Sequence, residues 1–319
     1  MTAIQEETAV EKTVADPKDA AVESPFKRIL SDYMESPVAV IGAIGVILVI
    51  FIAVIGPFIA PTDPYDLSSV SFMDNLLAPG ETMANGTVAW LGTDGAGRDL
   101  VSAMIYGLRI SLGVGVGSGI IALIIGCTLG MIAAYFGGRT DMIIMRVVDM
   151  QLSFPAILVA LILLAVVKGG PNEPGYFAVF KIIAALVVVQ WAYYARTIRG
   201  SALVERRKEY VEAANCLALG NSRVVFRHLL PNCIAPIIVV GTMQTAHAIS
   251  LEATLSFLGL GLPQTEPSLG KLISNGFDYV MSGKYWITVF PGLALLFMIV
   301  SINLVGDRLR DVLNPRLQK

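Results

Sequence analysis

The stretch EYVEAAN at residues 209–215, which runs on to LLP at residues 229–231, is a short polar segment between two strongly apolar regions. Glu209 and Glu212 lie in the early turns of the helix that it predicts, where the helix dipole favours negative charge. One apolar face is predicted by the helical spacing of four residues: Tyr210, Ala213, Ala214 and Leu217. Such a helix is either a docking surface for a soluble partner or an ordinary amphipathic surface helix.

The composition on both sides of this segment indicates a membrane protein. The chain has 319 residues, of which 55% are hydrophobic and only 15% are charged, and its mean hydropathy is +0.69. Soluble domains carry about 25% charged residues. Several stretches of about 20 apolar residues are long enough to cross a hydrocarbon core of about 30 Å as helices. Most of them lack the polar stripe of a soluble helix, so we expect an all-α integral membrane protein.

We expect six membrane-spanning helices, because six long apolar stretches are separated by loops. They cover approximately residues 38–60, 110–136, 141–167, 177–198, 231–260 and 286–305. Most of the 23 Lys and Arg residues lie at one set of span ends or in the loop at 199–230. Loops rich in Lys and Arg stay in the cytosol, so both termini and the segment around Glu212 are predicted to be cytosolic.

The chain divides into a tail and a membrane domain. Residues 1–25 are polar, acidic and poor in large apolar groups, and we expect a disordered cytosolic tail there. Residues 26–319 form the membrane domain, with a long outer loop at about 61–108, a loop at about 199–231 that includes the opening segment, and a second outer loop at 261–285. The three cysteines, Cys127, Cys216 and Cys233, show no metal-ligand spacing and are expected to be free thiols.

Several stretches together resemble one family of transporters. EAA at 212–214 and LP at 230–231 have the spacing of the coupling loop of bacterial ABC-importer permeases. The remaining chain is similar to the C-type permease subunits of dipeptide and oligopeptide importers, a family that also handles nickel and other small solutes. That similarity covers roughly residues 26–316 and is carried by WLGTD at 90–94, GRD at 97–99, IYG at 105–107, RISL at 109–112, SFLGLG at 256–261, NLVGD at 303–307, RD at 310–311 and PR at 315–316.

The resemblance implies the type I, binding-protein-dependent importer permease fold with six transmembrane helices and a cytosolic coupling helix, in the inner membrane of a bacterium. It implies a second homologous permease subunit, two ATPase subunits (or a homodimer), an external substrate-binding protein and no nucleic acid. ATP and Mg would be bound by the partners, with no cofactor on this chain, which would be a transport subunit and not an enzyme. The residues expected to couple to the ATPases are Glu209, Glu212, Ala213, Ala214, Leu217, Ala218, Gly220, Leu230 and Pro231.

The sequence departs from the family pattern at two positions. Ala218 stands where the coupling loop has glycine, so the turn after the predicted helix is either stiffer or shifted to Gly220. Leu269 stands where the family usually has tryptophan, in a Pro-Ser-Trp-Gly stretch. The second departure weakens any substrate inference from the second outer loop.

Small residues recur in the second predicted span. Gly126, Gly130 and Ala134 are four residues apart and share one helix face, which is typical of close helix packing in lipid. A nucleotide-binding glycine loop is the competing interpretation, but it needs Gly-Lys followed by Ser or Thr. The two Gly-Lys pairs, at 270–271 and 283–284, lack that residue. We therefore expect no phosphate loop for ATP on this chain.

A few ionisable residues fall inside predicted spans, where a charge costs about 2.5–3.5 kcal/mol. Arg146 and Asp149 are three residues apart and are expected to form a structural ion pair. Glu252 and His247 are candidates for the translocation pathway, and a structural bond to another helix is the alternative for Glu252. His228 and His247 are the only histidines and are far apart, so no metal site and no catalytic site are expected.

The leading hypothesis is therefore the permease subunit of an ATP-driven importer for dipeptides or oligopeptides. An importer of nickel or another small solute of the same family is the first alternative. A self-sufficient secondary transporter is less favoured, because such proteins usually show an internal repeat or paired broken helices and none is evident. An intramembrane enzyme is a further alternative, but no nucleophile–base or metal-binding set is apparent.

Overall fold

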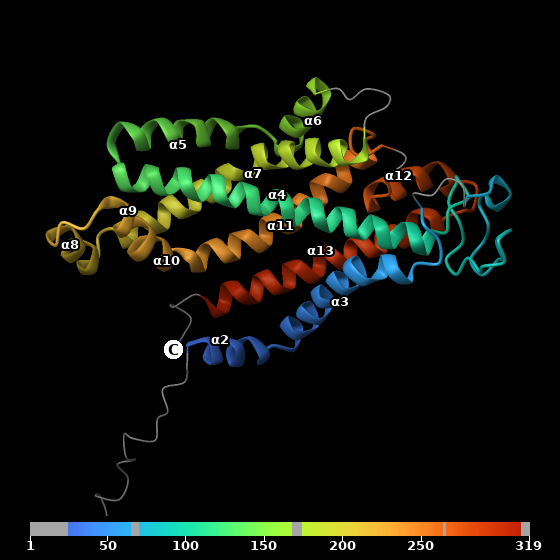
Figure 1. Cartoon of the computed structure of the whole chain (residues 1–319), viewed down its shortest axis with the longest axis horizontal. Helices are drawn as coiled ribbons and strands as arrows, with labels where there is room; N and C mark the ends of the chain where they lie inside the picture. Colours follow the sequence, from blue (N-terminus) through green and yellow to red (C-terminus); the bar gives the residue numbers. More distant parts are fainter. Residues whose placement is uncertain (1–24, 65–69, 168–173, 264–265, 314–319) are drawn as a thin grey trace, which may run out of the picture.

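The structure, a computed structural model, describes residues 25–64, 70–167, 174–263 and 266–313 (Figure 1). Within these residues the chain is helical, with two isolated β-bridges and no strand. The predicted tail lies outside the described residues apart from Pro25, where the first described helix begins. The elements are α2 (Pro25–Met34), α3 (Pro37–Ile59), η1 (Phe72–Asp74), α4 (Leu100–Phe136), α5 (Gly138–Ser153), α6 (Ala156–Val166), α7 (Gly175–Glu205), α8 (Glu209–Cys216), α9 (Asn221–Arg223), η2 (Val224–Leu229), α10 (Leu230–Asn232), α11 (Ile234–Phe257), α12 (Leu269–Val280) and α13 (Trp286–Val312).

Five helices, α3, α4, α7, α11 and α13, are long and apolar enough to cross a membrane. Figure 1 shows them running along the long axis of the molecule, and each of them contacts at least two of the others. Their lengths of 23 to 37 residues exceed the approximately 20 residues that a hydrocarbon core requires. The structure thus confirms the prediction of an all-α, multi-pass membrane protein.

The third predicted span is not one straight helix. Residues 141–167 fall on α5 and α6, whose axes are bent by 92°, so a sixth span exists only if this bent pair is counted as one. The bend lies at Phe154 and Pro155, where Phe154 has the extended conformation φ −95°, ψ 142°. A residue before proline is disfavoured in the helical region, and proline lacks the N–H that a continuing helix needs.

Two predicted loops are shorter than expected because the helices beside them extend further. α4 begins at Leu100, so the first outer loop ends at residue 99 and not at about 108. Asp99 caps this helix, because its carboxylate accepts a hydrogen bond from the Ser102 N–H at 2.8 Å. α7 continues to Glu205, so the loop predicted to begin at 199 starts only after that residue.

The second outer loop contains the amphipathic helix α12, which was not predicted from the sequence. Ser268 caps it by accepting a hydrogen bond from the Lys271 N–H at 3.2 Å. Leu269, Leu272 and Gly276 lie on its buried face. A Cβ at Gly270 would lie 2.4 Å from the Ala253 carbonyl oxygen, so this glycine lets α12 rest directly on α11. Leu269, where the family usually has tryptophan, is fully buried in this contact region.

α4 and α7 approach each other closely at the small residues of α4. A Cβ at Gly126 would lie 2.3 Å from the Trp191 carbonyl oxygen, and a Cβ at Gly130 would lie 2.3 Å from the Ala195 carbonyl oxygen. Real Cβ atoms essentially never come this close to other atoms. Ala134, one turn further on, is buried in the same region. The backbones of the two helices are therefore in direct contact along this face.

Two ion pairs join α5 to α7. Asp141 accepts two hydrogen bonds from the Arg199 guanidinium, at 2.5 and 2.6 Å. Asp149 pairs with Arg196 at 2.5 Å, across the two helices. The expected pairing of Asp149 with Arg146 along α5 is therefore wrong. The reason is that α5 packs against α7, which brings an arginine of the second helix to the Asp149 carboxylate.

Candidate functional site

The segment around Glu212 lies at one end of the helix bundle. Figure 1 shows α8, α9 and α10 together there, while α12 and the loop between α3 and α4 lie at the opposite end. α8 covers residues 209–216, which agrees with the helix predicted for this stretch. Two regions have features of a functional site. One is α8 with its neighbours at this end, and the other is the middle of the bundle, between the long helices.

α8 is fixed to its neighbours through Tyr210. The Tyr210 hydroxyl donates a hydrogen bond to Glu205, at the end of α7, at 2.9 Å. It accepts one from the Asn232 amide of α10 at 3.3 Å. Burial, together with the adjacent Glu205 carboxylate, raises the pKa of Tyr210 to about 12, so the hydroxyl keeps its proton at neutral pH. Through these bonds the first turn of α8 is tied to the end of α7 and to α10.

The two faces of α8 have different environments. Val211 and Ala214 are buried and belong to a cluster with Val224 and Leu229 of η2. In contrast, Leu217, just beyond the helix, is 74% exposed. Glu209, Glu212 and Ala213 are also exposed. The predicted apolar face is therefore divided, because Ala214 holds α8 against η2 whereas Ala213 and Leu217 are exposed. The side chains available to another protein form what we call the docking face: Glu209, Glu212, Ala213 and Leu217.

Ala218 has a left-handed backbone conformation, which glycine adopts more readily than alanine. Its φ is +51°, in the left-handed region, while Gly220 has an ordinary φ of −60°. The Leu219 N–H donates to the Ala214 carbonyl at 3.2 Å, which is the long hydrogen bond of a Schellman motif with Ala218 at its left-handed position. The turn is therefore not shifted to Gly220. A non-glycine residue in this conformation costs roughly 1–2 kcal/mol.

We expect Ala218→Gly to stabilise the turn after α8 by about 0.5–1 kcal/mol, because relief of the left-handed strain outweighs the added backbone entropy of glycine. Hydrogen–deuterium exchange of the α8 amides in the purified protein should slow by roughly two- to fivefold. Gly220→Ala is the control, since a Cβ there meets nothing within 4 Å, and it should leave the exchange unchanged. Faster exchange in Ala218→Gly would contradict the assignment of strain to this residue.

Leu230 and Pro231 follow directly after α8, α9 and η2. Both lie in α10, a short helix with Pro231 in its first turn, where the missing proline N–H is not needed. Leu230 packs against the cluster that contains Ala214. α11 begins three residues after Pro231, at Ile234, because Cys233 interrupts the helix with φ −100°, ψ 1°. Of the coupling residues predicted from the sequence, Ala214 and Leu230 thus share one packed cluster. The others are exposed: Glu209, Glu212, Ala213, Leu217, Ala218, Gly220 and Pro231.

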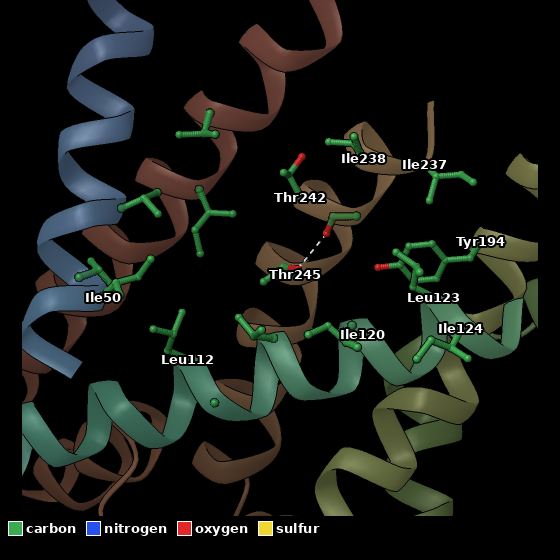
Figure 2. A pocket seen from close by; sticks show the side chains of 18 of the residues that line it. Ile50, Leu112, Ile120, Leu123, Ile124, Tyr194, Ile237, Ile238, Thr242 and Thr245 are labelled. Atoms are coloured by element: carbon green, nitrogen blue, oxygen red, sulfur yellow. Dashed lines mark hydrogen bonds between the residues drawn. The ribbon is translucent and has the colours of Figure 1, made fainter. Parts of the chain in front are cut away.

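A large cavity, with a volume of about 1190 Å³, lies among α3, α4, α11 and α13 (Figure 2). Most of the lining residues that Figure 2 labels are Ile and Leu. Thr242 and Thr245 are among the few polar side chains, and the Thr245 hydroxyl donates within its own helix to the Gly241 carbonyl at 2.9 Å. The cavity therefore presents a mostly apolar surface, which suits lipid tails or apolar side chains better than a polar solute.

A second, smaller hollow of about 440 Å³, which we call the polar hollow, is lined by polar as well as apolar side chains. It lies among α7, α11 and α13 and contains His247. Its lining residues are Tyr193, Met243, Gln244, Ala246, His247, Ser250, Ile299 and Asn303. Of these lining residues only His247 was predicted from the sequence to lie in the pathway, and Asn303 was noted as part of a motif. The other polar residues lie on three helices that are distant in sequence, and no local pattern brings them together.

Glu252 does not line this hollow. It is fully buried, and its carboxyl oxygens accept hydrogen bonds from Ser111 of α4 and Ser256 of α11, both at 2.7 Å. Ser268, the capping residue of α12, lies beside the same carboxyl group. The structure therefore does not bring together the two residues predicted for the pathway. The surroundings of Glu252 favour the alternative, a structural bond that joins α11 to α4 and α12.

Comparison with known proteins gives a consistent result. The family model described as "Binding-protein-dependent transport system inner membrane component" matches residues 126–319. The chain belongs to this family. A second model, "N-terminal TM domain of oligopeptide transport permease C", matches residues 24–79. The match over residues 126–319 includes α8, η2 and the polar hollow, and the match over residues 24–79 includes α2 and α3.

Among the relatives, the di/tripeptide transport system permease protein DppC of Pseudomonas aeruginosa (strain UCBPP-PA14) is 36% identical over 296 residues, which are 92% of this chain and 93% of the relative. The glutathione transport system permease protein GsiD of Pectobacterium atrosepticum is 32% identical, with 94% of both chains covered. An inward-facing structure of the MetNI methionine ABC transporter has a TM-score of 0.52, covering 66% of this chain and 96% of its own at 18% identity. This permease is therefore a multi-pass transport subunit with the type I importer fold.

Proposed function

We propose that this permease forms half of the translocation path of an ATP-driven importer for dipeptides and short oligopeptides. The observation that carries the proposal is the docking face on α8, which is exposed while the rest of α8 is fixed to the membrane-spanning helices. A surface of this kind can transmit the movement of a soluble partner into the membrane. The names of the relatives, which refer to di/tripeptide and glutathione transport, support peptides as the substrate class.

The partners follow from the family. A second homologous permease subunit would complete the path, two ATPase subunits (or a homodimer) would contact α8 and its counterpart, and an external binding protein would deliver the peptide. ATP and Mg would be bound by the ATPases and not by this chain. The distribution of Lys and Arg supports cytosolic termini in the inner membrane that the family implies, and it supports a cytosolic position of α8, where ATPases could reach it.

The geometry suggests how the movement would be transmitted. Tyr210 links α8 to the end of α7 and to α10, and Arg206, directly after α7, donates to the Ala134 carbonyl of α4 at 3.0 Å. Closure of the ATPase dimer would therefore move α8 together with α4 and α7 as one unit. For a nearly complete switch between inward-open and outward-open states, the partners must favour one state by about 5.5 kcal/mol.

Uptake into proteoliposomes tests this proposal. The permease, its second permease subunit and the ATPases are reconstituted together, with the binding protein outside and ATP inside the vesicles. We expect accumulation of a radiolabelled dipeptide that requires both ATP and the binding protein, and competition by other unlabelled dipeptides. ATP-dependent uptake of nickel or another small solute that dipeptides do not inhibit would contradict the peptide assignment. Uptake driven by an ion gradient without ATP would contradict the importer class.

A further inference from the structure

The polar hollow around His247 contains side chains whose hydrogen-bonding groups are unused. Tyr193, Gln244, His247, Ser250 and Asn303 make no side-chain hydrogen bond to any residue in the described part of the chain. Gln244 is buried, whereas Tyr193, His247, Ser250 and Asn303 are exposed in the isolated chain. Polar side chains within a membrane-spanning region are costly against lipid, which cannot supply hydrogen-bond partners. Five such groups around one hollow therefore indicate contact with water, a substrate or another subunit and not with lipid.

The depth of the hollow excludes the membrane surface as an explanation. His247 lies near the middle of α11, which begins at Ile234 and ends at Phe257. Gln244 and Ser250 are one turn away from it on either side, and Asn303 lies well inside α13, which ends at Val312. A helix of this length spans the hydrocarbon core. The hollow thus lies where water is present only if the protein itself forms a path for it.

The chemistry of the lining residues indicates the type of occupant. The Gln244 and Asn303 amides both donate and accept hydrogen bonds, as do the hydroxyls of Tyr193 and Ser250. No Asp, Glu, Lys or Arg lines the hollow. This set complements peptide bonds, which offer one N–H donor and one C=O acceptor each. It provides no fixed charge that would attract or repel a charged side chain, and it lacks the carboxylate or thiolate ligands that commonly bind metal ions.

The remaining walls allow side chains of different size. Met243, Ala246 and Ile299 are apolar, and methionine adapts its shape to different neighbours more easily than branched side chains do. A transporter of many peptides requires two things: polar groups that bind the main chain common to all peptides, and an adaptable apolar wall that accepts their different side chains. A volume of about 440 Å³ is within the range of small-ligand pockets.

From these observations we infer that the hollow is a peptide subsite of the translocation path, which holds the main-chain amides of a passing peptide through uncharged hydrogen-bonding groups. The inference rests on the proposed function and adds residues and a recognition mode to it. It predicts selection for the peptide backbone and indifference to the charge of the side chains.

The test uses the complete reconstituted importer. Asn303→Leu and His247→Leu each remove hydrogen-bonding groups while keeping a side chain of similar bulk, and each should lower kcat/KM for uptake by about tenfold. The same reduction is expected for neutral, cationic and anionic dipeptides, measured in parallel. Thr242→Val is the matched control, because Thr242 is on α11 but lines the apolar cavity, and uptake in this variant should equal that of the wild type.

Three results would overturn the inference. Unchanged uptake in both leucine variants would show that the hollow does not contact the substrate. A loss confined to charged dipeptides would show recognition of side chains. Failure of the variants to copurify with the second permease subunit would show that the hollow is a subunit contact. In each case uptake by the wild-type importer, reconstituted in parallel, tests the proposed function separately. If the wild type took up no peptide, the importer assignment itself would be contradicted, and not only the subsite.

Discussion

Replacement of Leu217 by aspartate should reduce ATP-dependent uptake to a few per cent of the wild-type rate. Leu217 is the large apolar residue of the docking face, 74% exposed in the isolated chain. Burial of an aspartate against an apolar pocket of a partner costs about 2 kcal/mol or more, which corresponds to roughly thirtyfold in affinity. The measurement is peptide uptake by proteoliposomes that contain equal amounts of variant and wild-type permease.

Leu217→Met is the control for this experiment. Methionine keeps an apolar side chain of similar volume, so uptake should stay close to that of the wild type. Ala214→Asp would not serve the same purpose, because Ala214 is buried against η2 and its replacement would disturb α8 itself. Normal uptake with Leu217→Asp would show that this side chain does not contribute to the contact with the ATPases.

The double variant Gly126→Ala/Gly130→Ala should lose about 3 kcal/mol of stability or more, because each new methyl group would overlap a backbone carbonyl of α7. The distances of 2.3 Å from these Cβ positions to the carbonyl oxygens of Trp191 and Ala195 cannot be relieved by rotation of a side chain. We expect a lower yield from membranes and a thermal unfolding midpoint, measured in detergent, well below that of the wild type.

Gly113 provides a matched control on the same helix. A Cβ at this position has nothing within 4 Å, so Gly113→Ala should leave the unfolding midpoint unchanged or slightly raised, by the higher helix propensity of alanine. If the double variant unfolded at the same temperature as Gly113→Ala, the direct backbone contact between α4 and α7 would be refuted.

Much of the fold could be predicted from the sequence because a membrane imposes a simple requirement on it. An apolar stretch such as residues 37–59 must be a helix, since every backbone group in lipid needs a partner within its own segment. The residues at which the helices begin and end were less predictable. α4 begins at Leu100 because Asp99 caps it, and α7 continues to Glu205, where polar residues extend the helix beyond the apolar stretch. α12 is too short to resemble a span and was missed.

The candidate site could be predicted only in part. The helix at 209–216 follows from local spacing, and the interest of Ala218 follows from the resemblance to the family, whose loop has glycine there. Which face of α8 is exposed depends on its contact with η2, and for this reason the burial of Ala214 could not be foreseen. The polar hollow depends on α7, α11 and α13 meeting in space, so His247 could be suspected alone but its neighbours could not.

The central claim is that the docking face of α8 binds an ATPase, and copurification tests it most directly. The tagged permease is extracted from bacterial membranes in mild detergent together with its native partners. We predict ATPase subunits in stoichiometric amount with the wild type and with Leu217→Met, and their loss with Leu217→Asp, while the second permease subunit is retained in all three. Isolation of the wild-type permease without any ATPase, under conditions that preserve the second permease subunit, would contradict the account.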